Sequence, residues 1–291
     1  MNASPPDPRS PAAESRPPGA THRAAVSGGE LRYLRLGAGR AVVLLHTLRT
    51  QLEYFRPLIQ RLDTSRFEAI AVDLPGHGES TAPRADYTAD YFSAAVAQLL
   101  EVCDVTDAIV VGDSIGGTIA LTLAAQQNAR IAHVVAVNPY DYGRRGGIRR
   151  SSPVANIVFG TMLSPGIGAV VARSGNRWVL RRVMEGGLHD PKALPPGLLD
   201  EMLRCGSLPG HARAFRSLNR QWRTWIAARA RYGVIELPTT LVYAADDWSH
   251  PDEREANARS IPAAGMVSLD RCGHFASLEQ PDAIVRLVEG L

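Results

Sequence analysis

Residues 108–117 read Ala-Ile-Val-Val-Gly-Asp-Ser-Ile-Gly-Gly, and this stretch decides the fold. The four apolar residues at its start are typical of a strand that is buried on both faces of a sheet. A helical pattern follows over residues 118–127. The pattern G-x-S-x-G at Gly112, Ser114 and Gly116 therefore lies on a sharp turn from a strand into a helix. The glycines remove Cβ atoms that would collide there, so the serine hydroxyl projects into open space.

Ser114 is a candidate nucleophile because a helix begins directly after it. The N-terminus of a helix carries a positive dipole end and backbone N–H groups that have no partner within the helix. The N–H group of Ile115 is therefore placed to stabilise the negative charge that develops on a carbonyl oxygen under attack. A chance match to the motif is the alternative in a chain with 26 glycines, but the strand before it and the helix after it favour catalysis.

A serine hydroxyl needs a base within hydrogen-bond distance, usually a histidine that a carboxylate orients. The chain has eight histidines. His274 lies after the last candidate strand and before the C-terminal helix, at the carboxyl edge of the sheet where Ser114 also lies. We therefore predict that His274 is the general base. Ordinary surface or core positions are expected for His22, His133, His189, His211 and His250.

Three carboxylates compete for the role of orienting His274. Asp246 and Asp247 end a predicted strand over residues 239–245. Asp141 follows the predicted strand before it. Adjacent residues at a strand end point in different directions, so at most one of Asp246 and Asp247 faces His274. With any of the three, the chain order of the groups is Ser, Asp, His, as expected for a nucleophile on a strand-to-helix turn.

Short apolar runs alternate with helical patterns from Leu31 onward, which predicts an α/β fold with a mostly parallel central sheet flanked by helices. Several runs are continuously apolar, as expected of strands that are buried on both faces. The predicted strands are residues 31–36, 41–46, 67–73, 108–112, 133–138, 239–245 and 266–270. The predicted helices that alternate with them are residues 53–62, 88–102, 115–127, 253–259 and 281–288.

The alternation stops over residues 139–237, a stretch that is far too long for an ordinary loop. We predict that residues 139–237 form an inserted helical cap over one end of the sheet. Its helical patterns cover residues 153–172, 178–184, 198–204 and 212–229. The α/β core then consists of residues 26–138 and 238–291.

Residues 1–25 are rich in proline and have no continuous apolar segment. A secretory signal needs such a segment, so residues 1–25 do not form one. Their composition is typical of a disordered tail.

Cys103, Cys205 and Cys272 lack the spacing of a metal site or of a disulfide framework, which favours a reducing, cytoplasmic setting. No metal and no cofactor is expected.

The chain has 291 residues, of which 45% are apolar and 21% are charged, as in an ordinary globular protein with a sizeable core. Its formal net charge of +3 is too small to indicate a nucleic-acid or membrane partner. We therefore expect a small-molecule substrate. The sequence contains no pattern that sets the oligomeric state.

The predicted cap carries an uneven charge. Eight arginines and no acidic residue lie between Tyr142 and Met184, namely Arg144, Arg145, Arg149, Arg150, Arg173, Arg177, Arg181 and Arg182. Residues 151–172 are uncharged and mostly apolar, and we interpret them as short helices that line an apolar acyl pocket. Pro165 and several glycines disfavour a membrane-spanning helix. The alternative is a basic rim that attracts an anionic substrate or, less favoured, a peripheral contact with an anionic membrane surface.

Five stretches can be compared with known families: VVLLH at 42–46, DLPGHGES at 73–80, GDSIGG at 112–117, VYAADDWSHP at 242–251 and GHF at 273–275. Together they resemble the α/β-hydrolase superfamily, in particular its small bacterial esterases, haloperoxidase-like enzymes and C–C hydrolases. The likeness covers residues 31–138 and 237–291. It implies the α/β-hydrolase fold and a Ser-His-Asp triad.

The resemblance favours Asp247 as the acid. Members of the superfamily often carry G-x-x-D-x-x-x-P at this point. Ala244 stands where the glycine would be, so Asp247 matches the carboxylate four residues before Pro251. Some members take the acid from the strand before the cap, which keeps Asp141 as the alternative. His77 matches a position in a tight turn and is not expected to be catalytic.

One departure from the resemblance concerns the loop after the early strand. Superfamily members usually have His-Gly there, whereas this chain has His46-Thr47-Leu48. By position, Leu48 would supply a second backbone N–H to the oxyanion hole, beside Ile115. Threonine adopts fewer backbone conformations than glycine, so the loop is shaped differently, the Thr47 hydroxyl joins the site, or the substitution is harmless. The positions expected to line the site are His46, Thr47, Asp113 and Phe275.

These patterns predict a serine hydrolase of the carboxylic ester hydrolase type. It would cleave an ester, thioester or related acyl bond of a small apolar substrate through an acyl-enzyme on Ser114. The alternative is a lyase, a cyclase or a ligand-binding protein of the same fold, acting in specialised metabolism without net hydrolysis. An epoxide hydrolase or a dehalogenase is disfavoured, because the resembling families with those activities use Asp at the position of Ser114.

Overall fold

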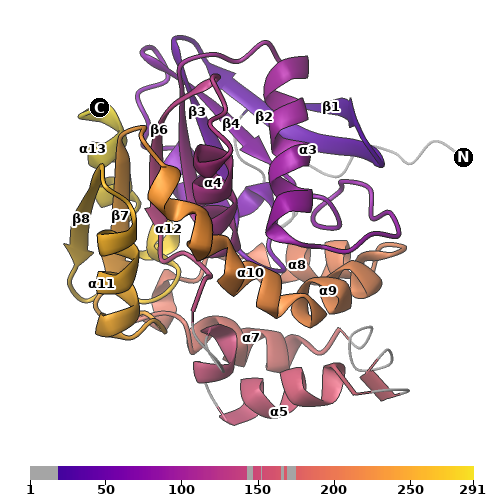
Figure 1. The fold of residues 1–291 in the computed structure, drawn as a ribbon. Helices are drawn as coiled ribbons and strands as arrows, with labels where there is room; N and C mark the ends of the chain where they lie inside the picture. Colours follow the sequence, from indigo (N-terminus) through magenta and orange to yellow (C-terminus); the bar gives the residue numbers. More distant parts are fainter. Residues whose placement is uncertain (1–18, 143–146, 152, 165–166, 169–174) are drawn as a thin grey trace, which may run out of the picture.

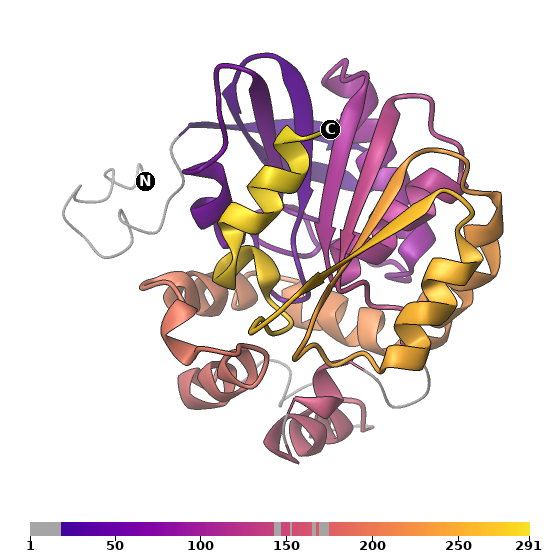
Figure 2. The same cartoon turned by 90° about the vertical axis from the view of Figure 1, so that its left-hand side faces the viewer.

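The computed structural model describes residues 19–142, 147–151, 153–164, 167–168 and 175–291. An eight-stranded sheet forms its centre, in the order β1-β2-β4-β3-β5-β6-β7-β8 (Figures 1 and 2). β1 pairs antiparallel with β2, and β2 pairs antiparallel with β4. The six strands β4, β3, β5, β6, β7 and β8, in this order across the sheet, are parallel to one another. The predicted α/β fold with a mostly parallel sheet is confirmed.

The strands are β1 (Ala20–Val26), β2 (Gly29–Gly37), β3 (Arg40–Leu45), β4 (Phe67–Val72), β5 (Ala108–Asp113), β6 (Ile131–Val137), β7 (Thr239–Ala244) and β8 (Ala264–Leu269). The helices outside residues 139–237 are η1 (Leu52–Phe55), α2 (Arg56–Ile59), α3 (Ala89–Val102), α4 (Ile115–Ala125), α11 (Pro251–Ser260), α12 (Ala276–Glu279) and α13 (Pro281–Glu289). The helices within it are η2 (Gly147–Arg150), α5 (Pro153–Met162), α7 (Arg177–Glu185), η3 (Pro191–Ala193), α8 (Leu198–Gly206), α9 (His211–Arg220), α10 (Trp222–Ala227) and η4 (Ala228–Val234).

Helices cover both faces of the sheet, and this explains the continuous apolar runs of the strands. Along β3, Val43 and Leu45 belong to a core that includes α3 and α4. Val42 and Leu44 belong to a second core that includes α2 and α13, and Figure 2 shows α13 in front of the strands. Because successive residues of a strand point to opposite faces, every position needs an apolar side chain.

The first strand corrects the expected boundary of the tail. Ala20–Val26 form β1 and pair antiparallel with β2, so residues 20–25 belong to the sheet and not to a disordered tail. A two-residue turn, Ser27 and Gly28, joins the two strands, and the φ of 92° at Gly28 favours glycine. Most β1 side chains are exposed, which explains why an apolar run is missing. Residues 1–18 lie outside the described part of the chain.

The single helix predicted over residues 53–62 is wrong. The structure has the 3₁₀-helix η1 at Leu52–Phe55, followed by the short helix α2 at Arg56–Ile59. Pro57 explains the break, since it has no N–H group to donate to the carbonyl of Glu53 and fits only the first turn of a helix. The other core helices agree with the predicted ranges to within two residues at each end.

Residues 139–237 lie between β6 and β7. Their helices from α5 to α9 lie beyond the carboxyl ends of the parallel strands (Figure 1), whereas η4 packs against α4 and α11. We call residues 139–237 the insertion. The helix expected over residues 212–229 is replaced by α9, α10 and the 3₁₀-helix η4. The helix expected over residues 153–172 begins as α5, but residues 165–166 and 169–172 lie outside the described residues. Within the part of the chain that the structure describes, no helix is long and apolar enough to cross a membrane.

Candidate active site

Ser114 lies at the turn between β5 and α4 with φ 57° and ψ −113°, a conformation that non-glycine residues rarely adopt. The surrounding backbone holds it there, because the Ser114 N–H donates to the carbonyl of Val137 at 2.8 Å. A Cβ atom on Gly116 would lie 1.9 Å from the carbonyl oxygen of Leu45, and one on Gly112 would lie 2.2 Å from the Gly116 backbone. Both glycines of the motif are therefore required by close backbone contacts.

His274 and Asp247 are joined by a hydrogen bond of 2.5 Å between Nδ1 and Oδ1. Both side chains are buried. Burial would raise the pKa of the Asp247 carboxyl, but the charge of His274 and hydrogen bonds from His274 and Ser249 lower it overall. The backbone N–H and the hydroxyl of Ser249 both donate to Oδ2 of Asp247. Asp247 is therefore held as a carboxylate that orients the imidazole.

The other ring nitrogen of His274 is in a different situation. Nε2 is buried and, within the described residues, has no hydrogen-bond partner. Since Nδ1–H donates to Asp247, the neutral ring carries its free lone pair on Nε2. His274 lines the same cavity as Ser114. A histidine in this state can accept the proton of a serine hydroxyl.

The cavity next to Ser114 has a volume of about 200 Å³. Its floor includes Thr47, Leu48, Ser114, His274 and Phe275 from the core. The insertion supplies most of the remaining wall, with Val158, Phe159 and Met162 from α5, Val179, Leu180, Val183 and Met184 from α7, Met202 and Leu203 from α8, and Phe215 from α9. The lining is mostly apolar, as in pockets that bind small molecules through a few placed polar groups.

The loop after β3 is built without the usual glycine. The carbonyl of Thr47 accepts hydrogen bonds from Nδ1 of His46 at 2.8 Å and from the hydroxyl of Thr50 at 2.9 Å. The positive φ in this loop occurs at Arg49, where φ is 62°, and not at Thr47. The left-handed residue of the loop is therefore Arg49, two residues after Thr47. Thr47 and Leu48 both line the cavity. The N–H of Ile115 belongs to the first turn of α4, where the backbone N–H groups of a helix have no partner within the helix.

Two residues expected to line the site do not line the cavity. His46 is buried, and its Nε2 accepts a hydrogen bond from the N–H of Leu74 at 3.1 Å. Burial lowers the pKa of His46 to about 4, so the ring is neutral and fixes the loop to the end of β4. Asp113 is buried as well and accepts hydrogen bonds from the hydroxyls of Tyr54 at 2.6 Å and Ser277 at 2.9 Å. Both side chains lie behind the site.

The alternative acids have other partners. Asp141 accepts hydrogen bonds from the amide of Asn257 and the hydroxyl of Tyr232, both at 2.9 Å. Asp246 lies 2.6 Å from Nδ1 of His189 at an exposed position. Neither carboxylate contacts His274 within the described residues. The structure therefore leaves Asp247 as the acid nearest to His274.

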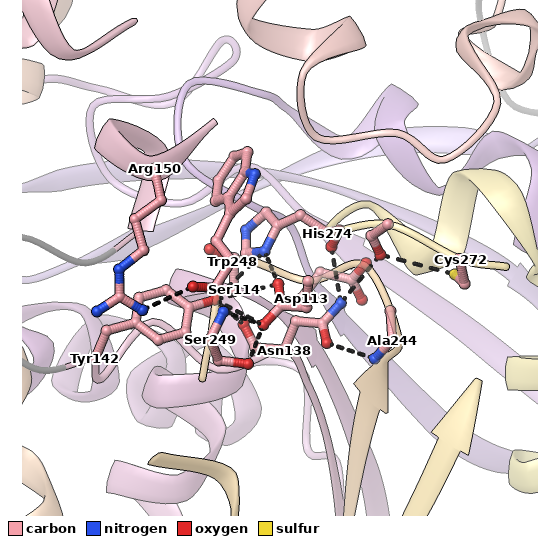
Figure 3. A network of polar contacts seen from close by, with 12 residues as sticks. Asp113, Ser114, Asn138, Tyr142, Arg150, Ala244, Trp248, Ser249, Cys272 and His274 are labelled. Carbon is pink, nitrogen blue, oxygen red and sulfur yellow. Dashed lines mark hydrogen bonds and ion pairs between the residues drawn. The ribbon is translucent and has the colours of Figure 1, made fainter. Parts of the chain in front are cut away.

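Sequence reasoning missed three residues around His274. Trp248 stacks on its ring, and the hydroxyl of Tyr142 lies 3.2 Å from Oδ2 of Asp247. The amide of Asn138 donates to the backbone carbonyl of His274 at 3.0 Å and accepts from the N–H of Ala244 at 2.9 Å (Figure 3). The position of Asn138, a polar residue at the end of a predicted strand, is the sequence signal that could have indicated it. Trp248 and Tyr142 gave no comparable signal.

Four arginines of the basic rim, the alternative considered for the insertion, form ion pairs in the described part of the chain. The pairs that the structure describes are Arg150–Glu253, Arg177–Asp200, Arg181–Glu185 and Arg182–Glu185. The three carboxylates lie outside residues 142–184, so part of the positive charge of that sequence window is compensated by acidic residues from other segments. Arg149 donates to the side chain of Asn156. Arg144, Arg145 and Arg173 lie outside the described residues.

The chain is similar to known proteins over most of its length. The chain is 26% identical over 276 residues to an uncharacterized protein of Mycobacterium tuberculosis, covering 90% of this chain and 78% of that protein. It is 25% identical over 277 residues to the 2-hydroxy-6-oxo-2,4-heptadienoate hydrolase of Pseudomonas putida, covering 91% of this chain and 94% of that enzyme.

The solved structure of the enol-lactonase from Burkholderia xenovorans LB400 is similar in fold, with a TM-score of 0.74 and 24% identity over 92% of this chain and 98% of that chain. The structure of the epoxide hydrolase CorEH is also similar, with a TM-score of 0.78 and 21% identity over 92% and 96% of the two chains. A family model described as alpha/beta hydrolase family matches residues 42–287. The chain therefore belongs to the alpha/beta hydrolase family.

Proposed function

We propose that this protein is a serine hydrolase that cleaves an ester, thioester or related acyl bond of a small substrate through an acyl-enzyme on Ser114. The state of His274 carries the proposal. Its Nδ1–H is hydrogen-bonded to the buried carboxylate of Asp247, and its Nε2 is unpaired in the cavity that Ser114 lines. This arrangement suits a general base next to a nucleophile.

In the first step, Nε2 of His274 takes the proton of the Ser114 hydroxyl while Oγ bonds to the carbonyl carbon of the substrate. The carbonyl oxygen then becomes an oxyanion. The backbone N–H groups of Leu48 and Ile115 are the proposed donors to this oxygen, and the N-terminus of α4 adds its positive dipole end. Asp247 keeps its hydrogen bond to Nδ1 and stabilises the imidazolium.

Collapse of the oxyanion breaks the bond to the leaving group, which takes the proton from Nε2 of His274 and departs as an alcohol or thiol. An acyl group then remains on Oγ of Ser114. In the second half, Nε2 takes a proton from water while the water oxygen attacks the acyl carbon. The second oxyanion then collapses, the bond between the acyl carbon and Oγ of Ser114 breaks, and Oγ takes the proton from Nε2 of His274. The products are a carboxylic acid and the regenerated serine.

We propose that the insertion acts as a cap over this site. Apolar side chains of α5, α7, α8 and α9 form the part of the cavity wall that faces Ser114. A closed apolar wall excludes bulk water and strengthens the electrostatic interactions in the site. The cap would therefore set both the protection of the acyl-enzyme and the selectivity for the acyl part.

The relatives support hydrolysis as the outcome, since the Pseudomonas putida protein is named as a hydrolase. Chemistry without hydrolysis on the same serine, as in a lyase or a cyclase, is the competing function.

Cys103, Cys205 and Cys272 are free thiols, which supports the cytoplasmic setting in our proposal.

A fluorophosphonate probe tests the nucleophile, because it labels serines that a neighbouring base activates. Wild-type protein should be labelled, Ser114→Ala should not, and His274→Ala should be labelled far more slowly. Ser207→Ala, which changes an exposed serine after α8, should be labelled like the wild type. Labelling that persists in Ser114→Ala would defeat the assignment. Labelling of the wild type without release of acid from any ester or thioester would favour the competing function.

A further inference from the structure

Arg49 is a charged residue in the cavity that the proposed reaction does not use. It follows Leu48 in the loop after β3 and lines the same cavity as Ser114 and His274. Its guanidinium packs over the ring of Phe215 from α9, with 4.7 Å between Cζ and the ring centroid. The side chain therefore lies between the core and the insertion, where a bound substrate would contact both.

Among the residues that the structure describes, none provides a counter-ion for the guanidinium of Arg49. Its Nε is buried without a hydrogen-bond partner, and the group forms no ion pair with any described residue. Burial lowers the pKa of Arg49, but an arginine keeps its charge at neutral pH. A cation that is partly withdrawn from water and has no partner is unfavourable, and such charges in proteins are normally paired.

Other arginines of this protein show the usual arrangement. Arg32 is buried and lies 2.5 Å from Asp73 and 3.0 Å from Glu53. The half-buried Arg150 lies 2.8 Å from Glu253. The contrast with Arg49 indicates that its partner comes from outside the chain.

The surroundings leave room for such a partner on the side of the main cavity. Among the described lining residues of that cavity, Arg49 is the one with a permanent charge. Behind the guanidinium, Gly206 at the end of α8 approaches so closely that a Cβ atom there would lie 3.2 Å from Nη2. The small cavity on that side has a volume of about 20 Å³, enough for roughly one water molecule. A larger anionic group must therefore approach from the main cavity.

We propose that Arg49 binds a carboxylate of the substrate, so that the preferred substrates are small acyl compounds with a free carboxylate at one end and an apolar linker. This inference rests on the proposed function, because it names the substrate class of that site. A carboxylate matches the planar fork of donors of a guanidinium and carries the single charge that the single cation requires. The apolar wall from α5, α7 and α8 suits the methylene groups between the two ends.

Selectivity between charged and neutral esters tests the proposal. Two matched pairs are compared by kcat/KM. The first is the 4-nitrophenyl half-ester of glutaric acid against 4-nitrophenyl valerate, and the second is 4-acetoxybenzoic acid against phenyl acetate. The first pair places the carboxylate on the acyl side and the second on the leaving-group side. In at least one pair the wild type should prefer the charged ester, and Arg49→Met should lower that preference by about 10- to 100-fold.

Arg49→Lys keeps the charge but not the fork, and should retain part of the preference. Arg220→Met is the matched control, since it removes one charge from an exposed position on α9 and should leave the ratio unchanged. Because both substrates of a pair are measured on the same protein, a loss of folded protein cancels in the ratio. Equal ratios for the wild type and Arg49→Met in both pairs would overturn the proposal.

A binding measurement separates this proposal from the proposed function. Glutarate should bind to Ser114→Ala in isothermal titration calorimetry, and its affinity should fall by about 10-fold or more in Ser114→Ala/Arg49→Met. If fluorophosphonate labelling fails while this difference is observed, the proposed function is wrong and the carboxylate site stands. If labelling succeeds and glutarate and the ester pairs show no dependence on Arg49, the carboxylate site is wrong and the proposed function stands.

Discussion

The indole of Trp248 lies against the imidazole of His274, with ring centroids 3.9 Å apart and the two planes 16° from parallel. The indole N–H of Trp248 donates to the carbonyl of Gly186 in the insertion at 3.2 Å, which fixes the plane of the indole. The imidazole is therefore held at Nδ1 by Asp247 and on one face by the residue that follows Asp247. A single strand end, that of β7, supplies both restraints.

Replacing Trp248 tests whether this stacking orients His274. Trp248→Leu removes the flat surface, and we expect kcat for a neutral ester such as 4-nitrophenyl butyrate to fall about 3- to 10-fold, the range that the energy of an aromatic pair allows. Trp248→Phe keeps an aromatic face and should recover most of the loss. Steady-state kinetics on the two variants gives the comparison. Identical kcat values for Trp248→Leu and Trp248→Phe would contradict a role of the aromatic face in orienting His274.

Replacing the two adjacent aspartates tests the assignment of the acid. Asp247→Asn removes the charge that orients Nδ1 of His274 and stabilises the imidazolium, so we expect kcat to fall by about 10³-fold or more. Asp246→Asn changes an exposed carboxylate whose partner is His189, and should keep kcat within about 3-fold of the wild type. Burst kinetics with a 4-nitrophenyl ester would locate the loss. A larger effect at Asp246 than at Asp247 would reverse the assignment.

The fold could be predicted from the sequence because strands that are buried on both faces leave continuous apolar runs. β5 and β7 illustrate this, since each ends close to where its apolar run ends. β1 could not be predicted in the same way. It is an edge strand with mostly exposed side chains, so its only signal was the turn residue Gly28.

The candidate site could be predicted where a residue follows a strand directly in the chain. Ser114 and Asp247 are of this kind, since each position is fixed by the strand before it. Arg49 and Tyr142 are different, because their roles depend on partners that tertiary packing brings from distant segments. The ion pair of Arg150 with Glu253 cancels a predicted charge for the same reason. Local charge patterns do not show which partners the fold will supply.

Substitution of the elbow glycines should destabilise the protein to an extent set by backbone contacts. A Cβ atom on Gly116 would lie 1.9 Å from the carbonyl oxygen of Leu45, which cannot move without displacing β3, so Gly116→Ala should lower the free energy of unfolding by about 3 kcal/mol or more. Gly265→Ala in β8 is the matched control, since a Cβ atom there meets no other described atom within 4 Å. Urea unfolding of both variants measures the difference. Equal stability of the two variants would contradict the close contact at Gly116.

Buried histidines should make the stability depend on pH. His77 is buried in the turn after β4, with its Nδ1–H donating to the carbonyl of Pro75 at 3.1 Å. Burial, followed by the charge of His46, lowers the pKa of His77 to about 3, whereas an unfolded histidine titrates near pH 6.5. As the pH falls below 6.5, the unfolded chain binds a proton that the folded protein excludes. The free energy of unfolding should therefore be highest above pH 6.5 and should decrease toward pH 3.

The substitution His77→Asn isolates this contribution, because the amide of asparagine can donate to the carbonyl of Pro75 but does not titrate. Urea unfolding between pH 8 and pH 4.5 should show a slope near pH 5 that is smaller than in the wild type by about 1.4 kcal/mol per pH unit, the value for one proton. His46, whose pKa burial lowers to about 4, still titrates in the variant, so part of the wild-type slope should remain. Parallel curves for the two proteins would mean that His77 is protonated in the folded state, which would require an unpaired cation in a turn packed against the apolar core.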